Sequence, residues 1–182
     1  LPDAAHALDK AIVAMFRQEW LLCGHKRPLR SIAIVDEAPE QQYLYPEFLL
    51  FQQLFQRHGL QAVIAAPTEL SLRDGVLWHG DLPIDLVYNR LTDFALTDAA
   101  SATLRQAYLQ NAAVLTPHPQ AHALYADKRN LVLLSDANRL QALGVPQATQ
   151  DILLASIPLT EIVKPAHAER LWRDRKRLFF KP

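Results

Sequence analysis

The sequence contains few of the cysteine and glycine residues that several classes of protein require. Its 182 residues include one cysteine, Cys23, and five glycines. A single thiol excludes an internal disulfide framework and a zinc site made of cysteines. Cys23 itself fits a small core position on an apolar helix face. Because no G-x-G-x-x-G follows the first apolar run, a Rossmann-type dinucleotide site is not expected.

An excess of charge of one sign is also missing. The chain has 19 basic and 19 acidic side chains, so its formal net charge is +0. No global field attracts nucleic acid or an anionic membrane, and any anion-binding site must be local. Basic residues do gather between 170 and 177, but Glu169 and Asp174 interrupt them and Leu171 and Trp172 form an apolar side. This pattern favours a solvated helix over a nucleic-acid patch.

Long hydrophobic runs and several catalytic motifs are absent as well. No apolar run approaches the roughly 20 residues of a membrane span, and the start lacks a signal-peptide pattern. We therefore expect a cytoplasmic protein that neither spans nor binds a membrane. No nucleophile elbow or Walker phosphate loop occurs. His118 and His122 are four residues apart, but Pro119 should hold His118 outside the helix, which argues against zinc binding.

The hydrophobic residues, which make up 50% of the chain, follow the periods of helices and buried strands. Apolar spacing predicts helices over about 4–22, 45–58 and 97–111. Nearly continuous apolar runs are typical of strands buried on both faces and predict strands at 31–35, 61–65, 84–88 and 113–115. Turn residues at 73–76 and 79–81 predict a hairpin between the second and third of these strands.

This alternation of strands and helices predicts an α/β fold with an open, largely parallel sheet and flanking helices. We divide the chain into an N-terminal helix (1–30), an α/β domain (31–117) and a mostly helical segment (118–182), with a boundary near 117–128. In the last segment we also expect short strands at 159–163 and 178–180, and a basic helix at about 166–176.

Polar side chains follow the predicted strands, where parallel topology would place them along one edge of the sheet. Asp36 and Glu37 follow the first strand, and Asn89 and Arg90 end the third. Ligands of open α/β sheets bind at this carboxyl edge. These four residues are therefore the candidates for binding a small-molecule substrate.

Arg90 has two interpretations, because a guanidinium at the end of a buried strand needs a partner. It could pair structurally with Asp93 or Asp36, or it could hold a substrate carboxylate in a bidentate grip.

The second half carries a series of short motifs. Asp127-Lys128 begins a predicted helix, Leu143-Gly144-Val145-Pro146 forms a turn, and an apolar run ends in Lys181-Pro182. Behind a four-strand α/β domain, this order resembles the opening of the ATP-grasp superfamily of ligases. The separation of the two lysines is similar to the usual spacing in that family. The chain would then comprise the pre-ATP-grasp domain and the beginning of the ATP-grasp domain.

The resemblance implies that Lys128 and Lys181 bind ATP. The family forms an acyl phosphate from a carboxylate and ATP, which an amine or thiol then attacks. Its glycine-rich loop and its Mg²⁺ ligands follow later in the chain, so both are expected beyond residue 182. The resemblance thus implies an N-terminal fragment, inactive alone, of a ligase that uses ATP, Mg²⁺ and a small-molecule substrate.

Two other functions stay open on the sequence. The chain could be a non-catalytic α/β ligand-binding or regulatory module in which Lys181 is incidental. It could also be an α/β transferase that uses the same carboxyl edge without ATP.

Overall fold

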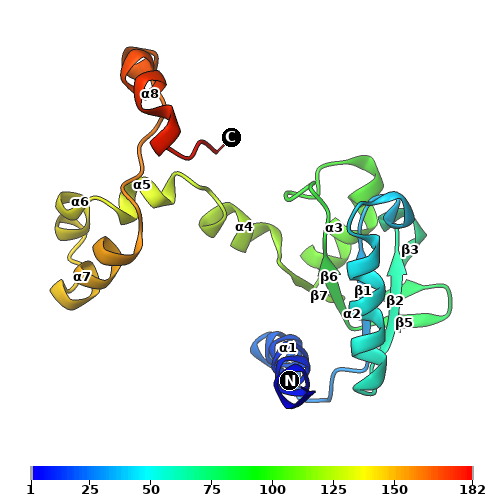
Figure 1. The fold of residues 1–182 in the computed structure, drawn as a ribbon. Helices are drawn as coiled ribbons and strands as arrows, with labels where there is room; N and C mark the ends of the chain where they lie inside the picture. Colours follow the sequence, from blue (N-terminus) through cyan, green and yellow to red (C-terminus); the bar gives the residue numbers. More distant parts are fainter. Residues whose placement is uncertain (1, 182) are drawn as a thin grey trace. The chain divides into compact units, whose positions relative to one another are not determined.

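The computed structural model describes the backbone of residues 2–181 and the side chains of residues 7–181 (Figure 1). The chain divides into two compact units, Leu1–Ala123 and Leu124–Pro182. Among the described residues, none of the helices combines the length and the apolar character needed to cross a bilayer.

A four-stranded parallel sheet forms the centre of the first unit. It consists of β1 (Ser31–Val35), β2 (Gln61–Ala65), β6 (Leu86–Asn89) and β7 (Val114–Thr116), in the order β2-β1-β6-β7. The α/β class and the parallel sheet predicted from the sequence are confirmed. Val35 lies opposite both Ala65 and Asn89, so the three strands end at the same level.

Two apolar layers cover the faces of this sheet because successive side chains of each strand point to opposite sides. Ile32 and Ile34 pack against α1 (Pro2–Leu22) and α2 (Tyr45–Arg57). Ala33 and Val35 pack on the other face, against α3 (Ala102–Leu109) and a small antiparallel sheet. That sheet comprises β3 (Leu70–Arg73), β4 (Val76–His79) and β5 (Leu82–Ile84).

The strand expected at 84–88 is divided in the structure. Ile84 ends β5 and pairs with Leu77 of the small sheet, whereas Leu86 begins β6 of the main sheet. The predicted turns are confirmed, with Arg73 opposite Val76 and His79 opposite Leu82. The apolar run is continuous in sequence, but Asp85 is the point at which the chain passes from one sheet to the other.

Asp85 is a buried carboxylate that joins three segments of the first unit. Its side chain is 8% exposed and accepts two hydrogen bonds of 2.7 Å from the Arg27 guanidinium. The backbone N–H of Arg30 donates a third, at 2.9 Å. Arg27 lies 4.7 Å from the ring centroid of Trp20, whose Nε1 donates to the Arg27 carbonyl at 2.6 Å. The hydrogen bonds that Arg27 donates to Asp85 raise the pKa of Arg27. This network fastens α1 to the amino ends of β1 and β6.

The second unit consists of short helices. Besides α4 (Pro119–Tyr125), which crosses the boundary, they are α5 (Asn130–Leu134), α6 (Ala137–Ala142), α7 (Gln147–Ser156) and α8 (Ala168–Asp174). The prediction of strands at 159–163 and 178–180 is wrong, since neither segment pairs with a strand in the described part of the chain. Apolar side chains alone do not make a strand, which needs a neighbour for its backbone hydrogen bonds.

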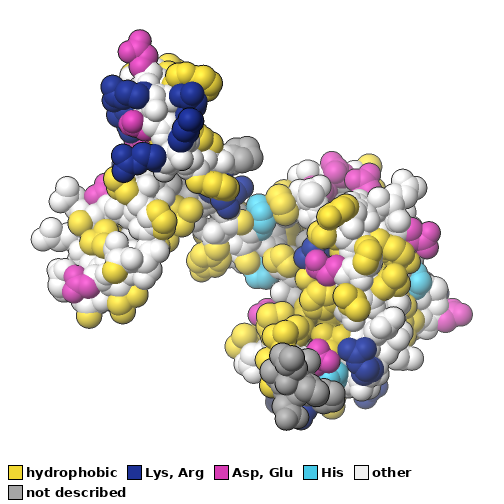
Figure 2. Space-filling model, in the orientation of Figure 1, with side chains coloured by type: hydrophobic (Ala, Val, Ile, Leu, Met, Phe, Trp, Pro, Cys, Tyr) yellow, Lys and Arg dark blue, Asp and Glu magenta, His cyan; other side chains and the backbone are white. Residues whose placement is uncertain are grey.

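The predicted basic helix is confirmed as α8 with short 3₁₀ turns on either side, η4 (Pro165–His167) and η5 (Arg175–Arg177). Lys and Arg side chains gather around it with acidic ones among them (Figure 2). Leu171 is buried, whereas Trp172 is exposed. The Arg175 guanidinium lies over the Trp172 ring, 4.3 Å from its centroid. Cys23 follows α1 and is exposed, so the core position expected for it is wrong.

Removing the Arg27 guanidinium should destabilise the first unit, because Asp85 would lose its counterion while staying buried. We expect Arg27→Met to lower the free energy of unfolding by about 2–3 kcal/mol in urea denaturation. Arg57→Met is the matched control, since the Arg57–Asp9 pair is 3.4 Å long and exposed. It should cost less than about 1 kcal/mol. Equal losses in both variants would contradict the role given to Arg27.

Candidate functional site

The candidate site lies at the carboxyl ends of β1 and β6, the two central strands. The chain leaves β1 toward α2, on one face of the sheet, and leaves β6 toward α3, on the other. Such a divergence of connections is where open α/β sheets bind ligands. The backbone N–H of Arg90 donates to the Val35 carbonyl at 2.8 Å. Asp36 and Glu37, which follow Val35, therefore lie at the same edge as Asn89 and Arg90.

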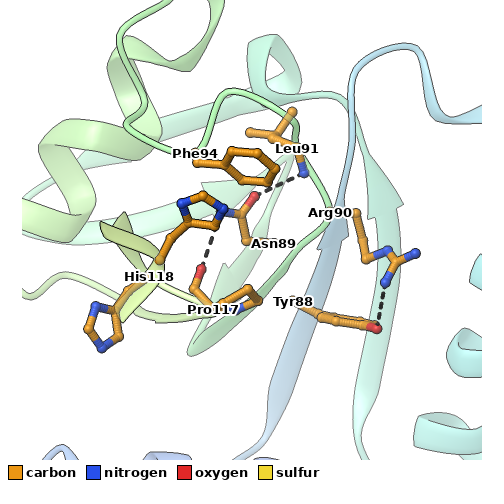
Figure 3. A pocket seen from close by; sticks show the side chains of 8 residues that line it. Tyr88, Asn89, Arg90, Leu91, Phe94, Pro117 and His118 are labelled. Carbon is orange, nitrogen blue, oxygen red and sulfur yellow. Dashed lines mark hydrogen bonds between the residues drawn. The ribbon is translucent and has the colours of Figure 1, made fainter. Parts of the chain in front are cut away.

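Arg90 and Asn89 nevertheless face opposite sides of the sheet. Figure 3 shows Arg90 next to Tyr88, and Asn89 on the other side with Leu91 and Phe94. This separation follows from the period of two in a β-strand. The four residues predicted for the substrate thus share an edge, but they do not form one cluster of side chains.

The Arg90 guanidinium has partners that the sequence did not indicate. It lies 3.2 Å from Oε1 of Glu47, on the first turn of α2, and it donates to the Tyr88 hydroxyl at 3.0 Å. Its centre is 5.7 Å from the ring centroid of Phe48. Neither Asp36 nor Asp93 forms an ion pair with Arg90 among the described residues. The partner is Glu47, 43 positions earlier, because α2 packs beside the end of β6.

Asp36 is a half-buried carboxylate at this edge. Burial raises the pKa of Asp36, against the opposing effects of the hydrogen bond from the Glu37 backbone and of the Arg90 charge. The Glu37 N–H donates to Asp36 Oδ1 at 2.8 Å, whereas the Glu37 side chain is exposed. Asp36 is therefore held at a cost in its charged form.

Asp93 organises the loop that follows β6. Its carboxylate accepts hydrogen bonds from the backbone N–H groups of Thr97, at 2.9 Å, and Asp98, at 3.0 Å. Burial acts to raise the pKa of Asp93, but these hydrogen bonds outweigh it and hold that pKa below its usual range. Asp93 therefore shapes the loop that carries Phe94.

A pocket of about 310 Å³ opens on the Asn89 side of the edge, and we call it the histidine pocket. It is lined by Tyr88, Asn89, Arg90, Leu91, Phe94, Pro117, His118 and His122. The Asn89 amide donates to the Pro117 carbonyl at 3.3 Å and accepts from the Leu91 N–H at 3.1 Å. The Phe94 and His122 rings stack with centroids 3.7 Å apart.

The sequence pointed to Asn89 and Arg90 but not to Phe94, His118 or His122 as members of one pocket. For the two histidines the sequence raises only the question of a zinc pair, and it argues against one. No group of three or more potential metal ligands occurs among the residues whose side chains are described. The available signal is the position of His118 three residues after the fourth predicted strand, at the same edge as the other candidates.

His118 has a defined hydrogen-bonding state. Its Nδ1 accepts from the backbone N–H of Ala121 at 3.1 Å, which caps the start of α4. The Tyr108 hydroxyl lies 3.4 Å from the same nitrogen. Because Nδ1 acts as the acceptor, the proton of the neutral ring is on Nε2.

A second pocket, of about 500 Å³, lies at the ends of β1 and β2. It is lined by Ala38, Pro39, Glu40, Gln41, Tyr45, Ile64, Ala66, Thr68 and Glu69. Glu69 accepts a hydrogen bond of 2.6 Å from the Ala66 N–H, so one of the two acidic side chains is already used in a turn. We call this the acidic pocket, since its lining includes no basic side chain.

Both lysines predicted to bind ATP belong to the second unit. Lys128 lies in the turn before α5 and is exposed, and its carbonyl accepts from the Leu131 N–H at 3.1 Å. Lys181 is also exposed, with Nζ 5.6 Å from the ring centroid of Phe179. Neither ammonium pairs with a carboxylate of the described residues.

Comparison of the sequence with models of protein families gave no match, and comparison with curated proteins gave none either. The features of the molecule that bear on function are the edge residues, the two pockets and the two lysines.

Neutralising Asp36 should stabilise the protein in a pH-dependent way. The raised folded-state pKa means that the contribution of this carboxyl to stability is complete below its unfolded-state pKa and is lost as the pH rises through the folded-state pKa. We expect Asp36→Asn, which keeps the acceptor for Glu37 N–H, to raise the free energy of unfolding at neutral pH by about 0.5–1 kcal/mol.

The gain should disappear at a pH below about 3.9, where both forms of residue 36 are neutral. Urea denaturation at several pH values measures this, with Glu40→Gln, an exposed carboxylate, as the control. A gain that is independent of pH would show that the Asp36 charge is not its source.

Proposed function

We propose that the chain is the N-terminal part of an ATP-dependent carboxylate–amine or carboxylate–thiol ligase of the ATP-grasp type. The first unit would be the pre-ATP-grasp domain and supply the substrate edge. The second would begin the ATP-grasp domain and supply Lys128 and Lys181. The main support is the carboxyl edge of the parallel sheet, with two pockets, preceding a unit that carries the two lysines in the family's order.

The properties of the two lysines are consistent with phosphate binding. An ammonium is a compact positive charge that suits a polyphosphate, and it offsets charge that develops during phosphoryl transfer. A lysine just before a helix gains nothing from the helix dipole. Lys128 is exposed and has no carboxylate partner among the described residues, so its charge is available to an anion.

The proposed reaction has two steps. A carboxylate oxygen attacks the γ-phosphorus of ATP, the bond to the β-phosphate oxygen breaks, and ADP leaves. An amine or thiol then attacks the acyl carbon and displaces inorganic phosphate, and the nucleophile loses one proton. Mg²⁺ would offset the charge that develops on the phosphates, and it would need carboxylate or amide oxygens as ligands. In the proposal those ligands belong to the rest of the ligase.

A second candidate is a non-catalytic ligand-binding or regulatory module. It is favoured by the internal partners of the edge residues, because Glu47 and Tyr88 hold Arg90, and both ends of the Asn89 amide are bonded. An edge whose polar groups are already paired can bind a ligand without promoting a reaction.

ATP binding tests the proposed function directly. In the full-length protein, ATP–Mg²⁺ at about one hundred times its Kd should add about 2.7 kcal/mol of stability, seen as a higher Tm. Lys181→Ala should remove most of this shift, because a phosphate contact is lost. Lys164→Ala, another exposed lysine of the second unit, should keep it. The same shift in wild type and Lys181→Ala would remove Lys181 from the ATP site.

Arg90 can be tested against its structural partner. We expect Arg90→Ala to lower kcat/KM of the full-length ligase by roughly tenfold or more, since the charge at the substrate edge is lost. Glu47→Gln frees the guanidinium but keeps it in place, and should change kcat/KM much less. A drop in Tm of similar size in both variants, with kcat/KM intact, would assign Arg90 to structure alone.

A further inference from the structure

We propose that His118 is a pH-sensitive switch at the start of α4. The neutral imidazole caps this helix, and protonation of its Nδ1 removes the cap. The chain passes through α4 from the first unit into the second, because the boundary between the units falls after Ala123. The protonation state of His118 therefore determines whether this connecting helix begins with a cap or frays.

The cap is a side-chain hydrogen bond to the first turn of the helix. α4 begins at Pro119, and Nδ1 of His118 accepts the backbone N–H of Ala121, the third residue of the helix, at 3.1 Å. The N–H groups of a first turn have no partner within their helix, and a side chain at the preceding position supplies one. Serine, threonine, asparagine and aspartate are the usual caps, and none of them changes charge near neutral pH. A histidine in this place makes the cap titratable.

Protonation converts Nδ1 from an acceptor into a donor. A neutral imidazole has one nitrogen of each kind, whereas both nitrogens of an imidazolium donate. The Ala121 N–H can only donate, so it cannot stay bonded to a protonated Nδ1. Histidine is the side chain whose charge ordinarily changes between about pH 5 and 8. The cap is therefore present at the upper end of this window and is lost toward the lower end.

The Tyr108 hydroxyl is a partner that suits both states of the ring. It lies 3.4 Å from Nδ1 of His118, and the two rings are stacked with 19° between their planes. A phenolic hydroxyl donates to a neutral Nδ1 and accepts from a protonated one. Protonation thus leaves Nδ1 with its partner on α3 and takes away its partner on α4.

The other charged groups of this region do not oppose the switch. Among the described residues, no carboxylate forms an ion pair with His118 or with His122, which lies one turn further along α4. The Arg90 guanidinium lies on the other face of the sheet with partners of its own. Asp93, in the loop after β6, has a pKa below its usual range, so it stays charged throughout the window in which histidine titrates.

His122 titrates in the same range but does not cap the helix. Its ring stacks on Phe94 with the centroids 3.7 Å apart and 12° between the planes. An imidazolium keeps a favourable contact with the face of an aromatic ring, because the ring quadrupole attracts a cation. Protonation of His122 therefore leaves α4 attached to the loop that carries Phe94, and the loss of the cap depends on His118.

The cap of α6 is a matched internal control. There the Asp136 carboxylate accepts the backbone N–H of Arg139, which is also the third residue of its helix, at 3.2 Å. We expect amide exchange of Ala121, measured by NMR relative to its intrinsic rate, to become about fivefold faster when the pH falls from about 8 to 5. The same ratio for Arg139 should stay constant. An unchanged ratio for Ala121, or an equal change at both amides, would overturn the proposal.

Two substitutions distinguish the two histidines. His118→Asn retains a side-chain acceptor that does not titrate, so the exchange of Ala121 should lose its pH dependence, whereas His122→Gln should retain it. In the wild type, the midpoint for Ala121 should coincide with that of the ¹⁵N resonances of the His118 ring. A pH dependence that survives in His118→Asn, or a wild-type midpoint that follows the His122 ring instead, would contradict the switch.

Discussion

The buried carboxylate of Asp85 determines how the first unit is assembled. It lies where the chain passes from the small sheet to the main one, and a carboxylate in that position is stable only when its charge and lone pairs are satisfied. Arg27 supplies the charge, and Trp20 positions Arg27 from the end of α1. The start of β6, the first strand of the main sheet to follow Asp85, is thereby fixed beside β1, with α1 on one face. The carboxyl edge at the other end of these strands depends on that register.

The same strand distributes the candidate site over two faces. Tyr88 and Arg90 point toward α2, whereas Asn89 and Leu91 point toward the loop that Asp93 organises. Each face has a different environment as a result. On one side Glu47 neutralises a guanidinium, and on the other two histidines and Phe94 line a pocket without acidic side chains. A ligand at this edge therefore meets an asymmetric surface.

The second unit differs from the first in that it buries few large apolar side chains. Leu140 and Leu171 are its buried large apolar side chains among the described residues, whereas Leu159, Phe179 and others are exposed. Lys128 and Lys181 lie in this thinly packed part, exposed and without carboxylate partners among the described residues. The proposal that they bind ATP consequently rests on the order of motifs in the sequence and on the chemistry of lysine.

The sequence by itself determined the elements of the first unit and the edge where the site would lie. Continuous apolar runs specified the strands, as at 31–35 and 61–65, because hydrophobic periodicity and turn residues are local properties. Only the tertiary structure decided the partners. The pairing of Arg90 with Glu47 and of Arg27 with Asp85, the division of the run at 84–88, and the meeting of Phe94 with His122 all join residues whose proximity depends on packing. Strands at 159–163 and 178–180 failed as predictions for the same reason, since a strand is completed by a neighbour that its own residues do not specify.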